Sequence, residues 1–237
     1  MADLPILFSG AMVRAILREI EQPGTGKTQT RRVLTPQPTY HGLDDVPSLP
    51  TKRRYTFAEY LMVNSPNIDA CTPYEVGDRL YVREAWRCEA RLDKRAPRDI
   101  ATNYPGIKYI ATAEPDDFGI EGKFRQAMHM PRWASRITLI VTEVRVQRLQ
   151  EINEADAIAE GIEKDHAVGM TNVWGWRDYL RGHEIAKRHY ADPRDSFHSL
   201  WDSLNSDRGY SWEANPWVAA YTFRPIAGNI DQIAEAA

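Results

Sequence analysis

Apolar positions along this chain of 237 residues follow two different spacings, one typical of helices and one of strands. The helical spacing of three and four residues is clear between Met12 and Glu21, where Val13, Ile16 and Ile20 share one face. Pro23 and Gly24 follow one residue later in the sequence, and both residue types end helices. The first predicted element is therefore an amphipathic helix that ends near residue 21.

Two further helices are predicted in the second half of the chain. In DSFHSLWDSLN the apolar face holds Phe197, Leu200, Trp201 and Leu204, and Asp195 or Ser196 is the expected N-cap. The stretch QEINEADAIAEGI predicts a shorter helix that Gly161 ends. Its expected apolar face holds Ile152, Ala155, Ala159 and Ile162.

Alternation between apolar and polar positions predicts the strands. Gly77 and Asp78 form a turn before Leu80, Val82 and Glu84, which we place on one face. SRITLIVTEVRVQRL is the strongest predicted strand. The remaining predicted strands are GKTQTRRVL, residues 108–113 and NPWVAAYTFRPI.

These elements indicate an α+β fold, because several short strands occur with a few helices and no regular βαβ alternation. We expect a small, mostly antiparallel barrel or sheet in a single domain of residues 1–226. Residues 35–75 are proline-rich and residues 164–194 mix aromatic and charged side chains, so both are predicted insertions, the second a lid or a surface hairpin. Residues 227–237 are predicted to form a flexible tail.

Composition favours a soluble, cytoplasmic protein. Hydrophobic residues make up 43% of the chain and charged residues 27%, no apolar run reaches membrane-spanning length, and no signal peptide is recognisable. Two cysteines are too few for a disulfide framework. A net charge of −3 argues against a protein that coats nucleic acid, although local basic runs permit contact with RNA.

The stretch EQPGTGKTQTRR resembles half of a phosphate-binding loop, because Gly26, Lys27 and Thr28 match its Gly-Lys-Ser/Thr end. The first glycine of that motif would fall at Glu21, which carries a negative charge. A phosphate loop also follows a buried strand, whereas a helix is predicted here. The sequence therefore argues against an ATPase or GTPase.

Other common catalytic motifs are not found. The six histidines are scattered, and neither HExxH nor CxxC spacing occurs, so we predict no metal and no cofactor. A GxSxG motif does not occur either, which leaves a serine hydrolase of that type without support.

The segment GKTQTRR could itself carry chemistry. In an extended strand Lys27 and Thr30 point to opposite faces, but a bend at the glycines would bring them together. A neutral lysine can take the proton of a threonine hydroxyl and so create a nucleophile, and burial in general lowers the pKa of lysine. The alternative is a surface lysine near the end of a helix.

Several motifs in the chain are similar to those of one known family. KTQTRR, GDRLYVREAW, MPRWASRI and NPWV, together with a long strand that runs into a short helix, resemble phage-encoded members of the ASCH domain family. This family is a branch of the PUA-like barrels. The resemblance covers residues 5–32, 77–86, 130–162 and 197–223, and leaves both predicted insertions outside.

The resemblance implies an activity, because small bacterial members of the family are amidohydrolases that remove the acetyl group from N4-acetylcytidine. Their lysine, threonine and glutamate correspond by motif to Lys27, Thr30 and Glu160. Thr30 would attack the amide carbonyl, Lys27 would act as the base, and Glu160 would hold and polarise Lys27. From the residues alone, Glu160 would instead be a solvated group on the flank of its helix.

Three more residues are candidates for substrate binding. Arg32 would contact a phosphate or carbonyl oxygen or pair with an acid, Glu84 lies on the predicted strand after the turn, and Trp86 would stack on a base or belong to the core. We expect a hydrolase for N4-acylated cytosine nucleosides, with a small modified nucleoside as partner and no membrane. The alternatives are a PUA-like module that binds RNA or a modified nucleotide, and a phage structural or regulatory protein. The acyl group and the oligomeric state stay open.

Overall fold

The computed structural model describes residues 1–38, 54–55, 70–102, 104–113, 122–166, 174–180 and 189–233. The chain divides into two compact units. The first unit comprises Met1–Thr28, Val76–Thr142 and Phe223–Ala237, and the second comprises Gln29–Glu75 and Glu143–Thr222.

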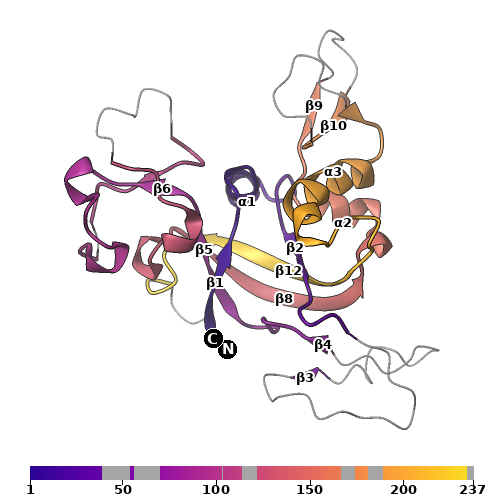
Figure 1. The fold of residues 1–237 in the computed structure, drawn as a ribbon, viewed down its shortest axis with the longest axis horizontal. Coiled ribbons are helices and arrows are strands. Elements are labelled where there is room, and N and C mark those ends of the chain that lie inside the picture. Colours follow the sequence, from indigo (N-terminus) through magenta and orange to yellow (C-terminus); the bar gives the residue numbers. More distant parts are fainter. Residues whose placement is uncertain are drawn as a thin grey trace. The chain divides into compact units, whose positions relative to one another are not determined.

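The helices and strands are labelled in Figure 1. The first unit contains β1 (Asp3–Leu7), α1 (Gly10–Glu21), β5 (Arg79–Arg83), β6 (Trp86–Arg87), β7 (Lys108–Tyr109) and the 3-10 turns η2 (Ala90–Leu92), η3 (Pro97–Asp99), η5 (Ala127–His129) and η6 (Arg132–Ala134). The second contains β2 (Gln29–Val33), β3 (Arg54–Tyr55), β4 (Ala70–Cys71), η7 (Leu149–Glu151), α2 (Glu154–Ala159), β9 (Lys164–His166), β10 (Trp174–Arg177), β11 (His189–Tyr190), α3 (Pro193–Asn205) and η8 (Ser206–Arg208). The long strands β8 (Ile137–Arg148) and β12 (Trp217–Ala227) begin in one unit and end in the other.

The main sheet has five strands in the order β1-β5-β8-β12-β2. The pair β1–β5 is parallel, whereas β5–β8 and β12–β2 are antiparallel. This arrangement confirms the predicted α+β class. No closed barrel is detected among the residues that the structure describes.

The first unit is organised around the strands that the alternating pattern predicted. Gly77 has a φ of +89°, which makes the turn into β5, and its N–H donates to the carbonyl of Val141 at 2.8 Å. Leu80, Val82 and Glu84 are buried on one face, as expected. Ile137, Leu139 and Val141 of β8 are buried as well, so the period-two pattern located this core correctly.

A second apolar cluster in the first unit surrounds Trp86. The buried members of this cluster are Trp86, Cys88, Ile100, Met130 and Ala134. The strand expected at residues 108–113 is only β7, because the N–H of Thr112 already turns back to the carbonyl of Tyr109 at 3.1 Å. That prediction was therefore right about the place and wrong about the length.

Helix α3 begins earlier than the sequence predicted. Pro193 occupies its first turn, and the carboxylate of Asp192 caps it by accepting from the N–H of Arg194 at 2.8 Å. Phe197, Leu200 and Trp201 are buried as expected, but Leu204 is 54% exposed, so its assignment to the apolar face was wrong.

Helix α2 departs further from its predicted face. Ala155 is exposed and Asp156 is buried, because Asp156 accepts hydrogen bonds from arginines of the second unit. Gly161, with a φ of +83°, follows the end of the helix as predicted.

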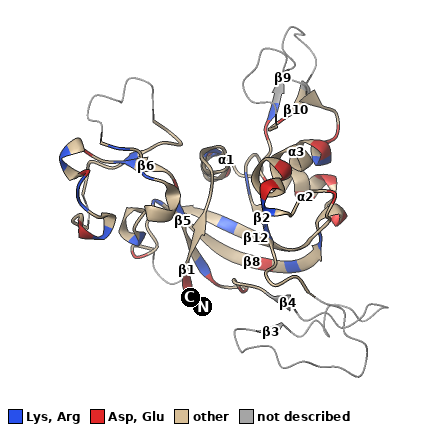
Figure 2. Ribbon diagram, in the orientation of Figure 1, with Lys and Arg blue, Asp and Glu red and all other residues tan. Residues whose placement is uncertain are grey.

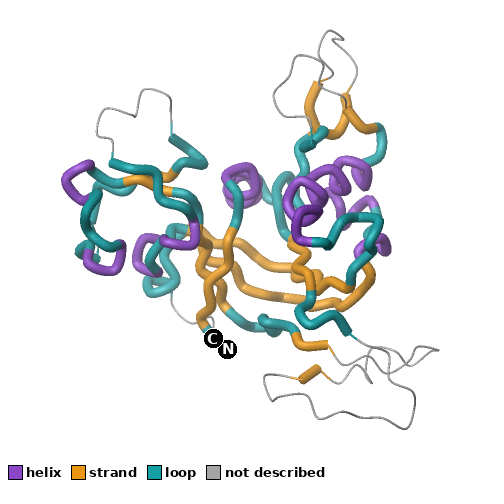
Figure 3. The backbone as a smooth tube through the Cα atoms, viewed as in Figure 1, coloured by secondary structure: helices purple, strands orange, loops and turns teal. Residues whose placement is uncertain are grey.

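The predicted insertions and tail are covered only in part. Residues 39–53 and 56–69 of the first insertion lie outside the described residues. In the second, β9, β10 and β11 form an antiparallel sheet, which agrees with a hairpin, and α3 packs against α2, β10 and β11 (Figure 3). Ile230 in the predicted tail is buried, and residues 234–237 lie outside the description. None of the described helices has the length and apolar character needed to cross a membrane.

The loop after α1 explains the glycines that resembled a phosphate-binding motif. The carboxylate of Glu19 accepts from the N–H of Gly24 at 2.9 Å and from that of Gly26 at 2.8 Å. The N–H of Lys27 donates to the carbonyl of Ala15 at 3.0 Å. Because these amides bind the helix, they do not form a cradle for phosphate.

Gly26 is required by close packing against α1, so we expect the variant Gly26→Ala to be destabilised. A Cβ atom at position 26 would lie 2.3 Å from the carbonyl oxygen of Ala15 and 2.3 Å from the nitrogen of Glu19. Both are backbone atoms, and relieving such overlap costs about 2 kcal/mol of the free energy of unfolding. Urea unfolding measures this difference.

The control is Gly10→Ala, where the nearest atom to the added Cβ is 3.7 Å away. Because alanine favours helices, its free energy of unfolding should stay within about 0.5 kcal/mol of wild type or rise. Equal stability of the two variants would contradict this account of the loop.

Candidate functional site

Lys27 lies in the first unit and is almost fully buried, with 1% of its surface exposed. Its Nζ atom is 5.7 Å from the centroid of the Phe8 ring, and Phe8 packs against Phe223. This burial is unusual for lysine and differs from the alternative of a surface residue near the end of a helix.

Thr30 lies on β2 in the second unit and is 1% exposed. Its Oγ1 accepts a hydrogen bond from Nη1 of Arg32 at 2.9 Å. In the register of β2 and β12, Thr30 is paired with Tyr221, so the two side chains share a face of the sheet. The threonine hydroxyl therefore lies beside a guanidinium group.

Arg32 is half-buried on this same face. Burial lowers the pKa of its guanidinium, while the negative charge of Glu160 and the hydroxyls of Tyr74 and Tyr221 act in the opposite direction. The rings of Tyr74 and Tyr221 meet edge to face, with centroids 5.1 Å apart. Arg32 still remains a cation at neutral pH, because the reference pKa of arginine is far above 7.

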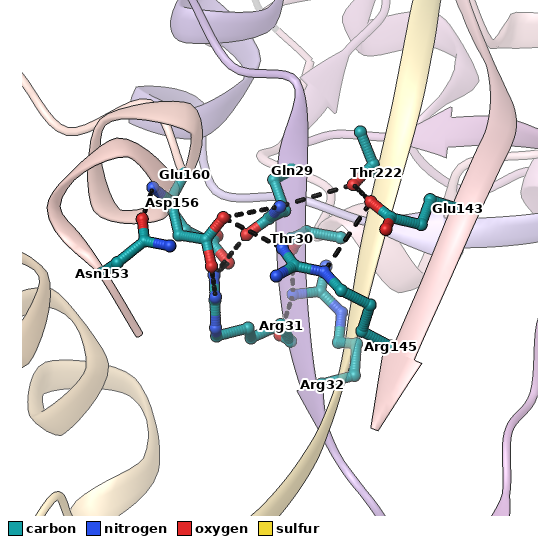
Figure 4. A network of polar contacts seen from close by, with 10 residues as sticks. All are labelled: Gln29, Thr30, Arg31, Arg32, Glu143, Arg145, Asn153, Asp156, Glu160 and Thr222. Carbon is teal, nitrogen blue, oxygen red and sulfur yellow. Dashed lines mark hydrogen bonds and ion pairs between the residues drawn. The ribbon is translucent and has the colours of Figure 1, made fainter. Parts of the chain in front are cut away.

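Glu160 directly follows α2 and is 3% exposed. Its Oε1 accepts a hydrogen bond from Nη1 of Arg31 at 3.0 Å (Figure 4). The prediction from residues alone, a solvated glutamate, was therefore wrong.

Arg31 is the centre of a larger polar network on the α2 side of β2. Besides Glu160, it donates through Nη2 to Asp156 at 2.8 Å and through Nη1 to the side chain of Gln29 at 2.6 Å. Asp156 also accepts from Nη2 of Arg145 at 2.9 Å. Figure 2 marks the basic positions along β2 and β8 and the acidic positions along α2.

The pKa of Asp156 reflects its pairing with the two arginines. Burial alone would raise the pKa of its carboxyl, but the hydrogen bond from Arg145 and the charges of Arg31 and Arg145 outweigh burial. The pKa is therefore lowered below its ordinary value of 3.8. Asp156 is ionised at neutral pH and is the counter-ion of two arginines.

Glu84 and Trp86 lie in the first unit and are both buried. Glu84 accepts from Nε and Nη2 of Arg136 at 2.8 and 3.0 Å, and burial raises its pKa more than Arg136 lowers it. The ring of Trp86 is fully covered, and the guanidinium of Arg125 lies 5.1 Å from its centroid. Trp86 thus belongs to the core, which was the alternative to a stacking platform.

The structure places Thr30, Arg32 and Glu160 in the second unit and Lys27, Glu84 and Trp86 in the first. Sequence reasoning missed Arg31, which holds Glu160, and it also missed Asp156 and Arg145, which belong to the same polar network. One signal was available: alternation along β2 puts Gln29 and Arg31 on one face, and a strand with such a polar face needs polar partners.

No group of three or more His, Cys, Asp or Glu side chains that could hold a metal ion occurs among the described residues. In comparisons with family models, curated proteins and solved structures, no match to the chain was found. The assignment to the ASCH domain family therefore stays a prediction from the quoted motifs.

We expect Asp156→Asn to destabilise the fold by about 3 kcal/mol at neutral pH, because Arg31 and Arg145 lose a buried counter-ion. The pKa of Asp156 is lower in the folded than in the unfolded chain. The carboxylate therefore stabilises the fold at pH values above the pKa of the unfolded chain, and this contribution is lost as the pH falls through the pKa of the folded chain. The stability difference between wild type and variant should therefore shrink below about pH 4. Urea unfolding at several pH values measures it.

Asp99→Asn is the control, because the side chain of Asp99 is 62% exposed and 3.8 Å from Arg98. Its free energy of unfolding should change by less than about 0.5 kcal/mol. A difference for Asp156→Asn that does not vary with pH would contradict the assigned ion pairs.

Proposed function

We propose that the protein is an amidohydrolase that removes the acyl group from N4-acylated cytosine nucleosides, with Lys27, Thr30 and Glu160 as its reactive residues. The observation that carries the proposal is the burial of all three polar side chains, which are 1%, 1% and 3% exposed. Lysine and glutamate side chains are rarely buried to this extent. The motif resemblance supports the same three residues.

The proposed reaction begins at Thr30. Its Oγ1 attacks the acyl carbonyl carbon while neutral Lys27 takes the hydroxyl proton. The bond between this carbon and N4 then breaks, and Lys27 returns the proton to N4, so the cytosine nucleoside leaves with a free amino group. Water next attacks the carbonyl carbon of the ester on Thr30, and Lys27 takes a proton from this water. The bond between the carbon and Oγ1 then breaks, Lys27 passes the proton to Oγ1, and the carboxylic acid leaves.

Arg32 fits this reaction as the group that stabilises the oxyanion. When Oγ1 of Thr30 bonds to the carbonyl carbon, the carbonyl oxygen on the same carbon becomes negatively charged. The guanidinium of Arg32 already donates to Oγ1 at 2.9 Å, so it is placed to approach this oxygen. A fixed cation aimed at developing charge is among the strongest catalytic devices.

The remaining parts of the proposal follow the same resemblance. The five-stranded sheet would be the described part of a PUA-like barrel, and the enzyme would act in the cytoplasm on a small modified nucleoside. Glu84 is proposed to influence substrate binding only by holding Arg136, since both of its carboxylate oxygens accept hydrogen bonds from that residue.

The direct test is release of cytidine from N4-acetylcytidine by the purified protein. We expect Thr30→Ala and Lys27→Ala to lower kcat/KM by about 1,000-fold, because each removes a group that acts on the proton or the carbonyl. Thr30→Ser keeps a hydroxyl and should retain measurable turnover. Chromatography of the released nucleoside measures the rates.

Thr28→Ala is the matched control, since Thr28 lies in the same segment, is half-buried and has no proposed role. Its turnover should stay within about threefold of wild type. All variants are checked for folding by thermal melting. If folded wild type releases no cytidine from acetyl or longer N4-acyl substrates, the proposed activity is wrong.

A further inference from the structure

Arg31 has a place in the second unit that a stabilising ion pair alone does not explain. It is the chain neighbour of Thr30, and its side chain points to the opposite face of β2, where it reaches Glu160. Its side chain has no exposed surface. One residue thus connects the backbone that carries the proposed nucleophile with the carboxylate of the proposed triad.

We propose that Arg31 is a positioning residue that sets the place of Glu160 relative to Thr30. This inference rests on the amidohydrolase function proposed above. Arg31 touches no substrate in this account, and it acts only through the carboxylate that it holds.

The contacts of Arg31 fix its guanidinium at both ends. Nη2 is held by Asp156, and Nη1 is shared between Gln29 and Glu160. The face of the guanidinium also lies 5.8 Å from the centroid of the Phe197 ring on α3. With these partners the group has little freedom to rotate, so Glu160 is held in one direction.

Asp156 and Arg145 balance the charges around Arg31. Arg31 and Arg145 carry two positive charges, and Asp156 and Glu160 carry two negative charges. Because Asp156 is shared by both arginines, Arg31 is not neutralised by Glu160 alone.

The residue type supports a positioning role. The planar fork of arginine can bind two carboxylates at fixed angles, whereas the ammonium group of lysine is a single point of charge. The variant Arg31→Lys keeps the charge and much of the volume, but it should not hold Asp156 and Glu160 in the same geometry. This variant therefore separates position from charge.

The experiment measures kcat and KM for N4-acetylcytidine in Arg31→Lys, Glu160→Gln and the double variant. We expect Arg31→Lys to lower kcat by about 100-fold, because a small displacement of a catalytic group has an effect of this size. KM should change by less than about threefold, since Arg31 is not placed against substrate. In the double variant kcat should equal that of Glu160→Gln alone, because Arg31 has no other route to the reaction.

Two further variants distinguish positioning from a general effect on folding. Arg145→Lys alters the other arginine on Asp156, so it should lower stability with less than about a fivefold effect on kcat. In Arg31→Ala, added guanidinium at millimolar concentration should restore part of kcat, and it should not do so when Glu160→Gln is also present. A purely structural role predicts no such dependence on Glu160.

Independent, multiplicative losses of kcat for Arg31→Lys and Glu160→Gln would overturn the inference while leaving the amidohydrolase in place. An Arg31→Lys variant that is folded and has the kcat of wild type would also overturn the inference. If the wild-type protein has no turnover, the proposed function fails and the role of Arg31 fails with it.

Discussion

The second unit depends on the ion pairs that the guanidinium of Arg31 makes with Asp156 and Glu160. These bonds join a strand to a helix that lies 125 residues later in the chain, and they place charged groups where little solvent reaches. Taking such groups out of water is costly, and each charge depends on the others for compensation. Removal of any one member leaves a buried charge without its partner, which destabilises the fold.

An arrangement of this kind is a poor way to gain stability alone, since well-packed apolar residues of similar volume often do as well or better. It does give a single geometry. Thr30 accepts from Arg32, and Arg31, the residue between them in the strand, holds Glu160. The same five-residue strand thus orders the hydroxyl, the guanidinium beside it and the carboxylate that the proposed reaction uses.

Much of the fold could be predicted because local pattern and packing agree. The period of three and four residues located α1, and alternation located β5, β8 and the buried Leu80 and Ile137. Predictions failed where a polar contact overrode the pattern. Asp156 is buried in place of Ala155 because two distant arginines need it, and α3 begins at Pro193 because Asp192 caps it. The arginine partners of Asp156 cannot be identified from a short window of sequence, whereas the Asp-Pro pair that starts α3 is a local signal that the prediction overlooked.

The site shows the same limit. Alternation correctly put Arg31 and Thr30 on opposite faces of the strand, but it could not identify Glu160, whose burial depends on Arg31. The family resemblance proposed Glu160, Lys27 and Thr30, and all three prove to be buried. Sequence reasoning also made Trp86 a candidate for stacking on a base, although this ring is enclosed in the core of the first unit.

The most direct measurement is a search for the covalent intermediate on Thr30. The protein is mixed with N4-acetylcytidine, quenched in acid within the first turnover, digested and analysed by mass spectrometry. The account predicts that the peptide containing Thr30 gains the mass of one acetyl group early and loses it as acetate is released. Cytidine release without acetylation of Thr30, or with the acetyl group on another residue, would contradict it.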